Sequence, residues 1–393
     1  MAENSPSALV HTLYHQLAAL PAWHEIADTD AIVEAALTIQ QIPAPTFAEA
    51  QRARYVHDQM VALGLAEVQL DALHNVYGSL PGRRPGPGIL ISAHTDTVFA
   101  QDVNLTVRRD GQRIYGPGLS DNSISVAALL HLARVLKQHQ LQADHTLWFV
   151  ANTGEEGLGD LAGMRAVIDH LHHKVGAVVV VDAQFGTVVH AGVASRRYRI
   201  SVAAAGGHSW QDWGAPSAVH VLVRLGARLT ELAVSVDPKS TFNIGVIEGG
   251  TTVNAIAQHA SLLLDLRSVD EARLAALIAQ VETIVADVTA EERGVTVRLE
   301  TVGDRPGGSI ERQHPLAQLA SAAYMAVGAN VIFDAASTDA NVPLSRGIPA
   351  VCIGMSRGGN AHRLDEYLEI DDIPAGMRSL LLLTLAAASA TTA

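Results

Sequence analysis

The stretch Ile89-Leu-Ile-Ser-Ala-His94-Thr-Asp96-Thr-Val98 decides how the rest of this 393-residue chain is interpreted. It is a short apolar run that follows the turn residues Pro85-Gly-Pro-Gly88 and ends in an imidazole and a carboxylate. A run of this kind, bounded by turn residues, predicts a strand that is buried on both faces. In an open α/β sheet, ligands bind beyond the carboxyl ends of such strands. His94 and Asp96 are therefore the first candidates for a functional site.

The same pattern returns three times further along the chain. His145–Ala151 runs into Thr153-Gly-Glu155-Glu156, Ala177–Asp182 ends in a carboxylate, and Ile348–Ile353 precedes a glycine-rich loop with His362. Helical apolar spacing at about 122–139, 160–173 and 313–328 separates these strands. Strands that alternate with helices predict a parallel sheet with helical crossovers. We therefore expect the polar groups at the strand ends to lie near one edge: His94, Asp96, Glu155, Glu156, Asp182 and His362.

The segment 195–303 follows a different pattern and has no cluster of ligand-type residues at its strand ends. Its expected elements alternate as βαββαβ, the split ferredoxin-like arrangement: strands at 197–204, 242–247, 262–268 and 295–301, and helices at 216–233 and 271–292. We predict an α/β fold with a mostly parallel sheet flanked by helices. Residues 1–194 and 304–393 form one domain, and 195–303 form a second domain inserted into it.

The sequence also predicts several local features outside the main sheet. Helical spacing occurs at 7–20 and 30–42. Thr46-Phe-Ala-Glu49 has the form of a capping box, which would open a helix that runs to about Gly64. Asn104–Tyr115 is expected to form a hairpin with Asp110-Gly111 in its turn.

The composition excludes several classes of protein. Hydrophobic residues make up 48% of the chain and charged residues 17%, which is typical of a globular protein with a large core. The net charge of −13 argues against nucleic acid, whose binding needs Lys and Arg. The single cysteine, Cys352, excludes a disulfide framework and a cysteine zinc site. The N-terminus shows no signal peptide and the run Ser379–Ala390 is too short for a membrane span, so we expect a cytoplasmic protein.

Imidazole and carboxylate groups without thiolates suit Zn²⁺, Co²⁺ or Mn²⁺. The strand ends offer more ligands than one catalytic metal needs, and two ions that share a carboxylate are a recurring arrangement in hydrolases. Asp121 is a further candidate, because it lies in the glycine-containing loop Gly116-Pro-Gly-Leu-Ser-Asp121-Asn122. Glycines let a backbone approach a site closely.

Five motifs together resemble those of a known family. They are His-Thr-Asp-Thr-Val at 94–98, Gly-x-Gly-x-x-Asp-Asn at 116–122, Thr-Gly-Glu-Glu-Gly at 153–157, the strand end at Asp182, and Asn-Ala-His-Arg-Leu-Asp-Glu at 360–366. In order and spacing they resemble the co-catalytic zinc metallopeptidases: aminoacylase, peptidase T, carboxypeptidase G and acetylornithine deacetylase. Ser337-Thr-Asp-Ala-Asn341 resembles a motif of the peptidase-T-like members. Some relatives have Asp-Met-Lys where this chain has Asp121-Asn122.

The resemblance implies a site with two divalent metal ions, zinc first and cobalt or manganese as alternatives. His94 and Asp182 would hold one ion, Glu156 and His362 the other, and Asp121 would bridge them. Glu155 would be the general base for a metal-bound water, and Asp96 would orient His94. The resemblance also implies a cis peptide bond between Asp121 and Asn122.

The resemblance extends to the inserted segment, and it implies that residues 1–194 and 304–393 form the catalytic domain and that 195–303 form a lid or dimerisation domain. Ala205-Gly-Gly-His208-Ser-Trp is similar to a lid segment whose His enters the active site of the partner subunit, which implies a homodimer formed through the lid domain. Asn254 and Arg267 match residues of the lid that contact substrate. Substrate contacts are also implied for Ser337, Thr338, Asp339 and Asn341.

These observations predict a two-metal hydrolase that cleaves a peptide or amide bond in a small substrate, with a di- or tripeptide favoured. An N-acyl-amino-acid deacylase or a carboxypeptidase is the alternative. A non-catalytic binding protein on the same scaffold would show the loss of a ligand or of Glu155, and none is missing. A serine or cysteine hydrolase is disfavoured, since the chain has no Gly-x-Ser-x-Gly motif and Cys352 lies within an expected strand.

Overall fold

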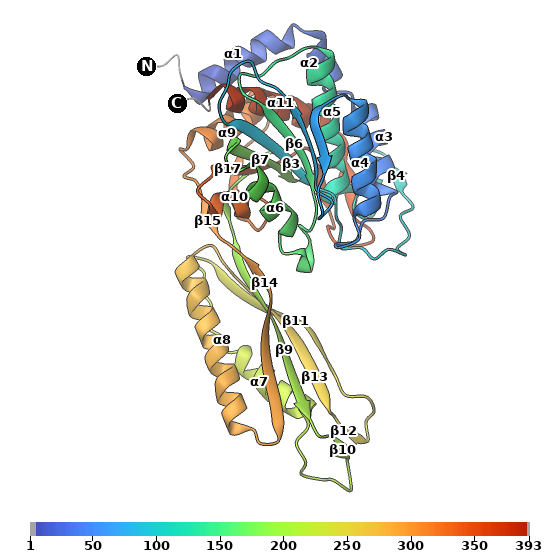
Figure 1. Cartoon of the computed structure of the whole chain (residues 1–393), viewed down its shortest axis with the longest axis vertical. Helices are drawn as coiled ribbons and strands as arrows, with labels where there is room; N and C mark the ends of the chain where they lie inside the picture. Colours follow the sequence, from blue (N-terminus) through green and yellow to red (C-terminus); the bar gives the residue numbers. More distant parts are fainter. Residues whose placement is uncertain (1–4, 391–393) are drawn as a thin grey trace. The chain divides into compact units, whose positions relative to one another are not determined.

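The computed structural model describes residues 5–390, and the chain divides into two compact units (Figure 1). The first unit contains the chain up to Gly192 and again from Gly308 onward, and the second contains Val193–Gly307. The predicted insert at 195–303 falls inside the second unit. The predicted segments 1–194 and 304–393 include residues 1–4 and 391–393, which lie outside the described residues.

The first unit is built on a large sheet with a parallel centre. Four neighbouring strands run parallel: β6 (Leu147–Asn152), β3 (Gly88–His94), β7 (Val175–Ala183) and β17 (Ala350–Gly354). On either side, β2 (Val76–Leu80) pairs antiparallel with β6, and β8 (Thr187–Gly192) pairs antiparallel with β17. The sheet is completed by β1 (Ala66–Leu70), β15 (Gly308–Ser309) and β16 (Ile332–Ala336). The predicted α/β fold with a large sheet is confirmed, although β2 and β8 run antiparallel to the central strands.

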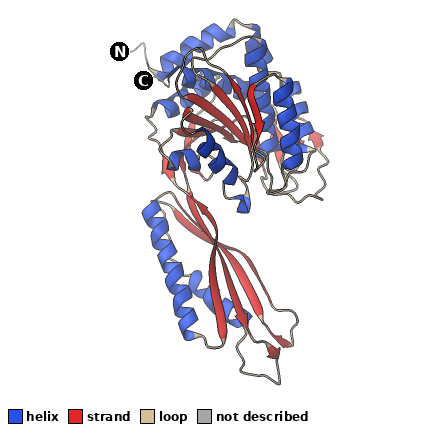
Figure 2. Cartoon of the chain, viewed as in Figure 1, coloured by secondary structure: helices blue, strands red, loops and turns tan. Residues whose placement is uncertain are grey.

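Helices cover both faces of this sheet (Figure 2). Alternate residues of β3 point to opposite sides: Ile89 and Ile91 join one hydrophobic cluster, and Leu90 joins another. Every residue of β3 is buried, as the continuous apolar run predicts. The first cluster includes residues of α1 (Pro6–Ala18), α2 (Pro21–Glu25), α3 (Thr29–Gln40), α4 (Ala50–Ala62), α5 (Ile124–Gln138), α9 (Pro315–Ala326) and α11 (Ile373–Ala390). The second includes residues of α6 (Ala162–Leu171) and α10 (Asn341–Ser345).

Helix α11 is longer than the apolar run predicted at Ser379–Ala390, because it begins at Ile373. Among the described residues it is the one helix whose length and composition would allow it to cross a membrane, and 72% of that stretch is buried. Burial of this extent is typical of a core helix.

The predicted capping box at Thr46–Glu49 is wrong. Helix α4 begins at Ala50, and Glu49 occupies the N-cap position without a side-chain cap. The carboxylate of Glu49 accepts a hydrogen bond from the N–H of Phe47, and the hydroxyl of Thr46 donates instead to Asp96. Phe47 has a φ of +74°, so the chain turns here before the helix starts.

The predicted hairpin is present as β4 (Arg108–Asp110) and β5 (Arg113–Tyr115). Strands β18 (Arg357–Gly359) and β19 (Tyr367–Glu369) extend it to a small four-stranded sheet in the order β18-β19-β5-β4. This sheet joins a segment that precedes Asp121 to the segments on either side of His362.

The second unit is a four-stranded antiparallel sheet in the order β11-β13-β9-β14. Its elements follow one another as βαββαβ: β9 (Ala194–Ala204), α7 (Ala218–Leu229), β11 (Ser240–Gly249), β13 (His259–Ser268), α8 (Glu271–Glu291) and β14 (Val295–Arg305). Tyr198, Ile200 and Val202 alternate along β9 and pack in a core with α7 and α8. A short pair, β10 (Gly207–His208) with β12 (Ala255–Ile256), lies apart from this sheet. A lid or dimerisation role for this unit stays a prediction.

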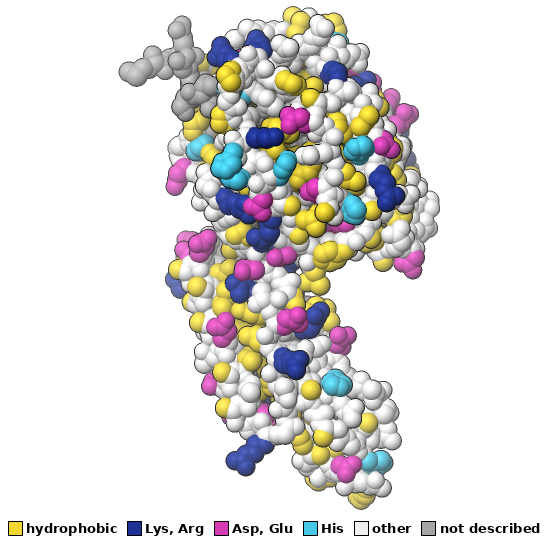
Figure 3. Space-filling view, viewed as in Figure 1, with side chains coloured by type: hydrophobic (Ala, Val, Ile, Leu, Met, Phe, Trp, Pro, Cys, Tyr) yellow, Lys and Arg dark blue, Asp and Glu magenta, His cyan; other side chains and the backbone are white. Residues whose placement is uncertain are grey.

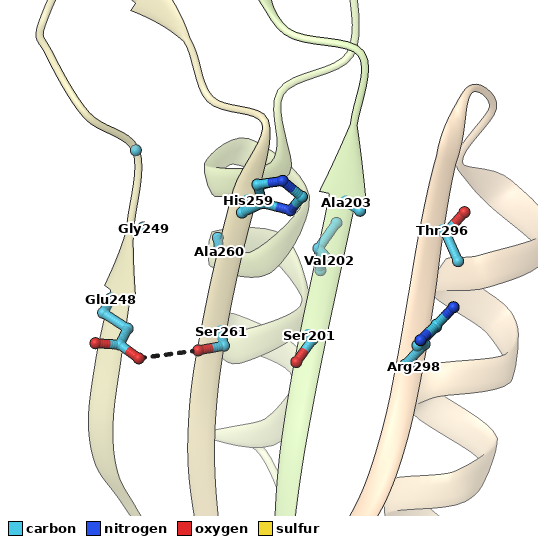
Figure 4. A pocket seen from close by; sticks show the side chains of 11 residues that line it. Ser201, Val202, Ala203, Glu248, Gly249, His259, Ala260, Ser261, Thr296 and Arg298 are labelled. Atoms are coloured by element: carbon cyan, nitrogen blue, oxygen red, sulfur yellow. Dashed lines mark hydrogen bonds between the residues drawn. The ribbon is translucent and has the colours of Figure 1, made fainter.

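The second unit also has a shallow cavity of about 770 Å³ across its four strands (Figure 4). Glu248 and Ser261 form a hydrogen bond of 3.3 Å at this cavity, and Arg298 lies on β14. The cavity does not contain any residue predicted for the active site. In Figure 3, acidic and basic side chains are interspersed over the face in view, so the excess of acidic charge is not segregated there.

Candidate active site

The parallel strands bring their polar ends to the same edge of the main sheet. His94 is the last residue of β3 and lies in register with Asn152, the last residue of β6. Glu155 and Glu156 lie in the loop that begins after Asn152, and Asp182 is the penultimate residue of β7. This arrangement follows from the parallel register that the sequence predicts.

Four side chains, arranged as two imidazole–carboxylate pairs, gather around the carboxylate of Asp121. Nε2 of His94 lies 3.1 Å from Oδ1 of Asp121 and 3.4 Å from Oδ1 of Asp182. Nε2 of His362 lies 3.2 Å from Oδ2 of Asp121 and 3.2 Å from Oε1 of Glu156. Asp121 therefore lies between two imidazole–carboxylate pairs, with one oxygen directed to each.

The donor set fits a metal ion. Nε2 of His94 and Oε1 of Glu156 are buried and have no hydrogen-bond partner among the described residues. One ligand atom each from His94, Asp121 and Glu156 lie within 4.8 Å of one another. Bonds of about 2.0–2.2 Å around tetrahedral zinc separate ligand atoms by roughly 3.3–3.5 Å, close to the distances between the imidazole nitrogens and carboxylate oxygens here. This group could hold a metal ion.

The electrostatics of the site also favour a cation. Burial alone would lower the pKa of His94, but the carboxylates of Asp182, Asp121 and Asp96 raise it well above its usual value. The nearby carboxylates of Asp121 and Glu156 raise the pKa of His362 to about 10. Burial raises the pKa of Asp182 to about 6, against the opposing effect of His94. Carboxylates crowded in this way attract positive charge, and a divalent metal would replace the protons on the imidazoles.

Asp96 holds the backbone of the two glutamates in place. Its Oδ1 accepts a hydrogen bond of 3.0 Å from the N–H of Glu155, and its Oδ2 accepts one of 3.0 Å from Glu156. Nδ1 of His94 lies 3.1 Å from the backbone carbonyl oxygen of Asp96 and 3.6 Å from its carboxylate. The orientation of His94 by Asp96 stays a prediction, and the backbone carbonyl makes the closer contact.

Arg52 supports this region from inside the core, a contribution that the sequence did not indicate. The guanidinium is buried and donates to the carbonyl oxygen of Thr95 at 2.7 Å. Burial lowers the pKa of Arg52 to about 10, and the nearby Asp96 opposes this shift. Arg52 is thus a buried cation that fixes the backbone between His94 and Asp96.

Glu366 is a second residue whose role the sequence did not reveal. Its Oε1 accepts hydrogen bonds from the N–H groups of Ser120 (2.7 Å) and Asp121 (2.9 Å), and its Oε2 accepts one from Gly118 (3.0 Å). Burial raises the pKa of Glu366 to about 7. This carboxylate ties the loop of Asp121 to the segment that carries His362. Within that loop the Asp121–Asn122 peptide is cis, as the resemblance implied.

The Ser337–Asn341 motif lies largely inside the protein. Asp339 and Asn341 have no exposed surface, and Thr338 is also buried. Nδ2 of Asn152 donates to Oδ2 of Asp339 at 2.7 Å, and burial raises the pKa of Asp339 to about 7. Substrate contacts of Ser337, Thr338, Asp339 and Asn341 stay predictions. The burial favours a supporting role for Asp339, and Asn152 is a partner that the sequence did not single out.

The second unit brings two of its predicted site residues together and separates the third. His208 lies opposite Ala255 in the β10–β12 pair, and the N–H of Ser209 donates to the carbonyl oxygen of Asn254 at 3.1 Å. Arg267 lies near the other end of β13 from His259 and donates to Asp265 at 2.7 Å. At about 3.3 Å per residue, Arg267 lies roughly 26 Å along the strand from His259.

Comparison with known proteins agrees with this geometry. The profile of Peptidase family M20/M25/M40 matches residues 90–386. A putative succinyl-diaminopimelate desuccinylase, DapE, of Mycobacterium tuberculosis is 28% identical over 74% of this chain and 80% of its own. Carboxypeptidase G2 of a Pseudomonas species is 25% identical over 76% of this chain and 74% of its own.

Solved structures show the same fold. A tripeptidase from Staphylococcus aureus superposes with a TM-score of 0.77 at 21% identity and covers 92% of this chain and 99% of its own. The resemblance inferred from the five motifs is therefore confirmed. The chain belongs to Peptidase family M20/M25/M40 and is a hydrolase of peptide or amide bonds.

Proposed function

We propose that this hydrolase binds two divalent metal ions, zinc in the first place, and cleaves small peptides. His94 and Asp182 would hold one ion, Glu156 and His362 the other, and Asp121 would bridge them. The observation that carries the proposal is the position of Asp121, with one oxygen 3.1 Å from His94 and the other 3.2 Å from His362. Bound ions would polarise the substrate carbonyl and lower the pKa of water.

Glu155 is the proposed general base. It takes a proton from the attacking water and delivers it to the leaving nitrogen. Its neighbour Glu156 reaches His362, and the backbone N–H groups of both glutamates are held by Asp96. Adjacent side chains cannot both face one metal ion comfortably, so the two glutamates take different roles. Glu155 is also buried, which keeps bulk water away from the carboxylate.

Among small amides, a di- or tripeptide is the favoured substrate. The Ser-Thr-Asp-Ala-Asn motif at 337–341 and the likeness of the fold to a tripeptidase support it. The second candidate is an N-acyl-amino-acid deacylase or a carboxypeptidase, which the named activities of the M. tuberculosis and Pseudomonas relatives favour. A cytoplasmic location remains the expectation from the sequence.

We further propose a homodimer in which the second unit completes the active site. His208 lies beside Asn254, which precedes β13 in the chain. Arg267 lies roughly 26 Å along β13 from the first residue of that strand, His259. A dipeptide cannot contact both places on one chain. If all three residues contact one substrate, the chain that supplies Arg267 must receive His208 and Asn254 from its partner.

The experiment that tests the proposed function compares the hydrolysis of Ala-Ala with that of N-acetyl-Ala by the metal-loaded protein. A peptidase of the favoured kind cleaves Ala-Ala with the larger kcat/KM. A larger kcat/KM for N-acetyl-Ala would favour the deacylase over the peptidase. If a protein with full metal content cleaves neither substrate, both proposed functions are overturned.

A further inference from the structure

A cavity of about 290 Å³ in the first unit opens beside the proposed metal ligands. Asp121 and Asp182 line it, and so do Thr187 of β8 and Asp334 of β16. Because two proposed ligands form part of its wall, a substrate held at the metal site can extend into this space. The volume is near the lower limit of ligand pockets, about 300 Å³, which suits one amino-acid side chain.

The cavity carries one carboxylate that the metal site does not use. Asp334 is exposed and accepts a hydrogen bond of 2.8 Å from the N–H of Ala335 through Oδ1. No ion pair of Asp334 is found among the described residues. The charges of Asp121 and Asp182 would be offset by bound metal, and no Lys, Arg or His is among the described residues that line the cavity. Asp334 therefore gives this space a negative charge without a protein counter-ion.

A second observation at the same cavity concerns Asn122. Its side chain is 1% exposed, and its Nδ2 donates to the carbonyl oxygen of Val181 at 3.0 Å. That bond fixes the amide orientation, and Oδ1 is left buried without a hydrogen-bond partner. A buried acceptor without a donor costs about 1–3 kcal/mol. A ligand that donates a hydrogen bond here would remove this cost.

We propose that this cavity binds a primary ammonium group of the substrate, with Asp334 as the residue that determines specificity and Asn122 as an acceptor. An ammonium group offers three donors and no acceptor, which matches an unpaired carboxylate and an unpaired amide oxygen. A substrate carboxylate would be repelled by the charge of Asp334 and would find only an acceptor in the amide oxygen of Asn122. The inference rests on the proposed function, since it names the substrate class of that site.

The strand order indicates where the ammonium lies in the substrate. β16 pairs with β8, β8 with β17, and β17 with β7, which carries Asp182. At about 4.8 Å between neighbouring strands, the backbones of β7 and β16 are roughly 14 Å apart across the sheet. The ammonium is therefore several bonds from the scissile amide. A lysine-like side-chain amine fits this distance, whereas the α-amine of a dipeptide is two bonds from the scissile carbonyl carbon and lies too near it.

The test measures kcat and KM of the metal-loaded enzyme for Ala-Ala, N-acetyl-Ala-Ala, Lys-Ala and Nα-acetyl-Lys-Ala. The variant is Asp334→Asn, which keeps an oxygen to accept the N–H of Ala335 and removes only the charge. Asp58→Asn, an exposed carboxylate in α4 that does not line the cavity, is the matched control. Metal content and Tm of both variants are compared with those of the unaltered enzyme.

For the recognised ammonium, Asp334→Asn raises KM by roughly tenfold, the effect of losing a charged hydrogen bond. If the cavity binds the side-chain amine, KM rises more for the two lysine substrates than for the two alanine substrates. A larger rise of KM for Ala-Ala and Lys-Ala than for their acetylated counterparts would show that Asp334 acts on the α-amine, and would overturn the site for a side-chain amine.

An equal loss on all four substrates, or no loss, would overturn the ammonium site while the proposed function stands. Hydrolysis of none of them by the unaltered, metal-loaded enzyme would overturn the proposed function and this inference together.

Discussion

Nε2 of His362 lies 3.2 Å from Oδ2 of Asp121, although the two residues come from loops on different strands. The other oxygen of the same carboxylate faces His94 at 3.1 Å. The arrangement therefore forms only when the segments that carry His94 and His362 both converge on Asp121. The residues that hold these loops matter as much as the ligands, because a shift of either loop separates the two imidazoles from Asp121.

Glu366 is the residue that holds the loop of Asp121 in place most directly. Glu366→Ala would leave the buried N–H groups of Gly118, Ser120 and Asp121 without their acceptor, and we expect metal affinity to fall by roughly 10–100-fold. Glu366→Gln keeps one oxygen and should lose less. Chelator competition measures the affinity, and Glu369→Gln, on a carboxylate that pairs with Arg113, is the control. Unaltered metal affinity in a folded Glu366→Ala protein would exclude this positioning role.

Substitution of Glu155 and substitution of Glu156 should impair different properties of the enzyme. Glu155→Ala is expected to keep its metal and lose roughly 10²–10⁴ in kcat, because the proton transfer is removed while the ligands remain. Glu156→Ala should lose metal, since it removes the carboxylate that lies 3.2 Å from His362. Metal analysis and steady-state kinetics on the same preparations check both. A nearly normal kcat for Glu155→Ala would show that the two roles are assigned wrongly.

The strand ends could be predicted because the information is local. Apolar runs such as 89–93 mark buried strands, and helices between them require a parallel register, so His94, Glu155 and Asp182 had to approach one edge. The cis bond after Asp121 followed from the family resemblance alone. Neither inference required knowledge of a side-chain contact.

The support of the site could not be predicted, because it depends on contacts between distant segments. An arginine in an amphipathic helix is usually exposed to solvent, but Arg52 is buried and donates to the carbonyl oxygen of Thr95. Thr46 fits a helix cap, but its hydroxyl bonds to Asp96 instead. Glu366 belonged to a recognised motif, and only the fold shows that it accepts bonds from three backbone N–H groups.

A mixing experiment tests whether His208 acts in the active site of a partner subunit. His208→Ala and Glu155→Ala should each be nearly inactive alone. In a mixed dimer, the chain with intact Glu155 receives His208 from its partner, so one of the two sites is complete. Random reassociation makes half of the dimers mixed, and about a quarter of full activity should return.

The control for this experiment is proof of subunit exchange, for example by native mass spectrometry of the mixture. If His208 acts within its own chain, every site in the mixture lacks one group. Activity that stays at the level of the separate variants, with exchange demonstrated, would exclude the arrangement in trans.

The measurement that tests the two-metal site most directly is the metal content of the protein after chelation and reconstitution, followed by activity on Ala-Ala. Removal of metal should abolish activity, and zinc, cobalt or manganese should restore it. The positions of His94, Asp182, Glu156 and His362 around Asp121 predict two ions per chain at full activity. Full activity with one ion or fewer per chain would contradict the two-metal site.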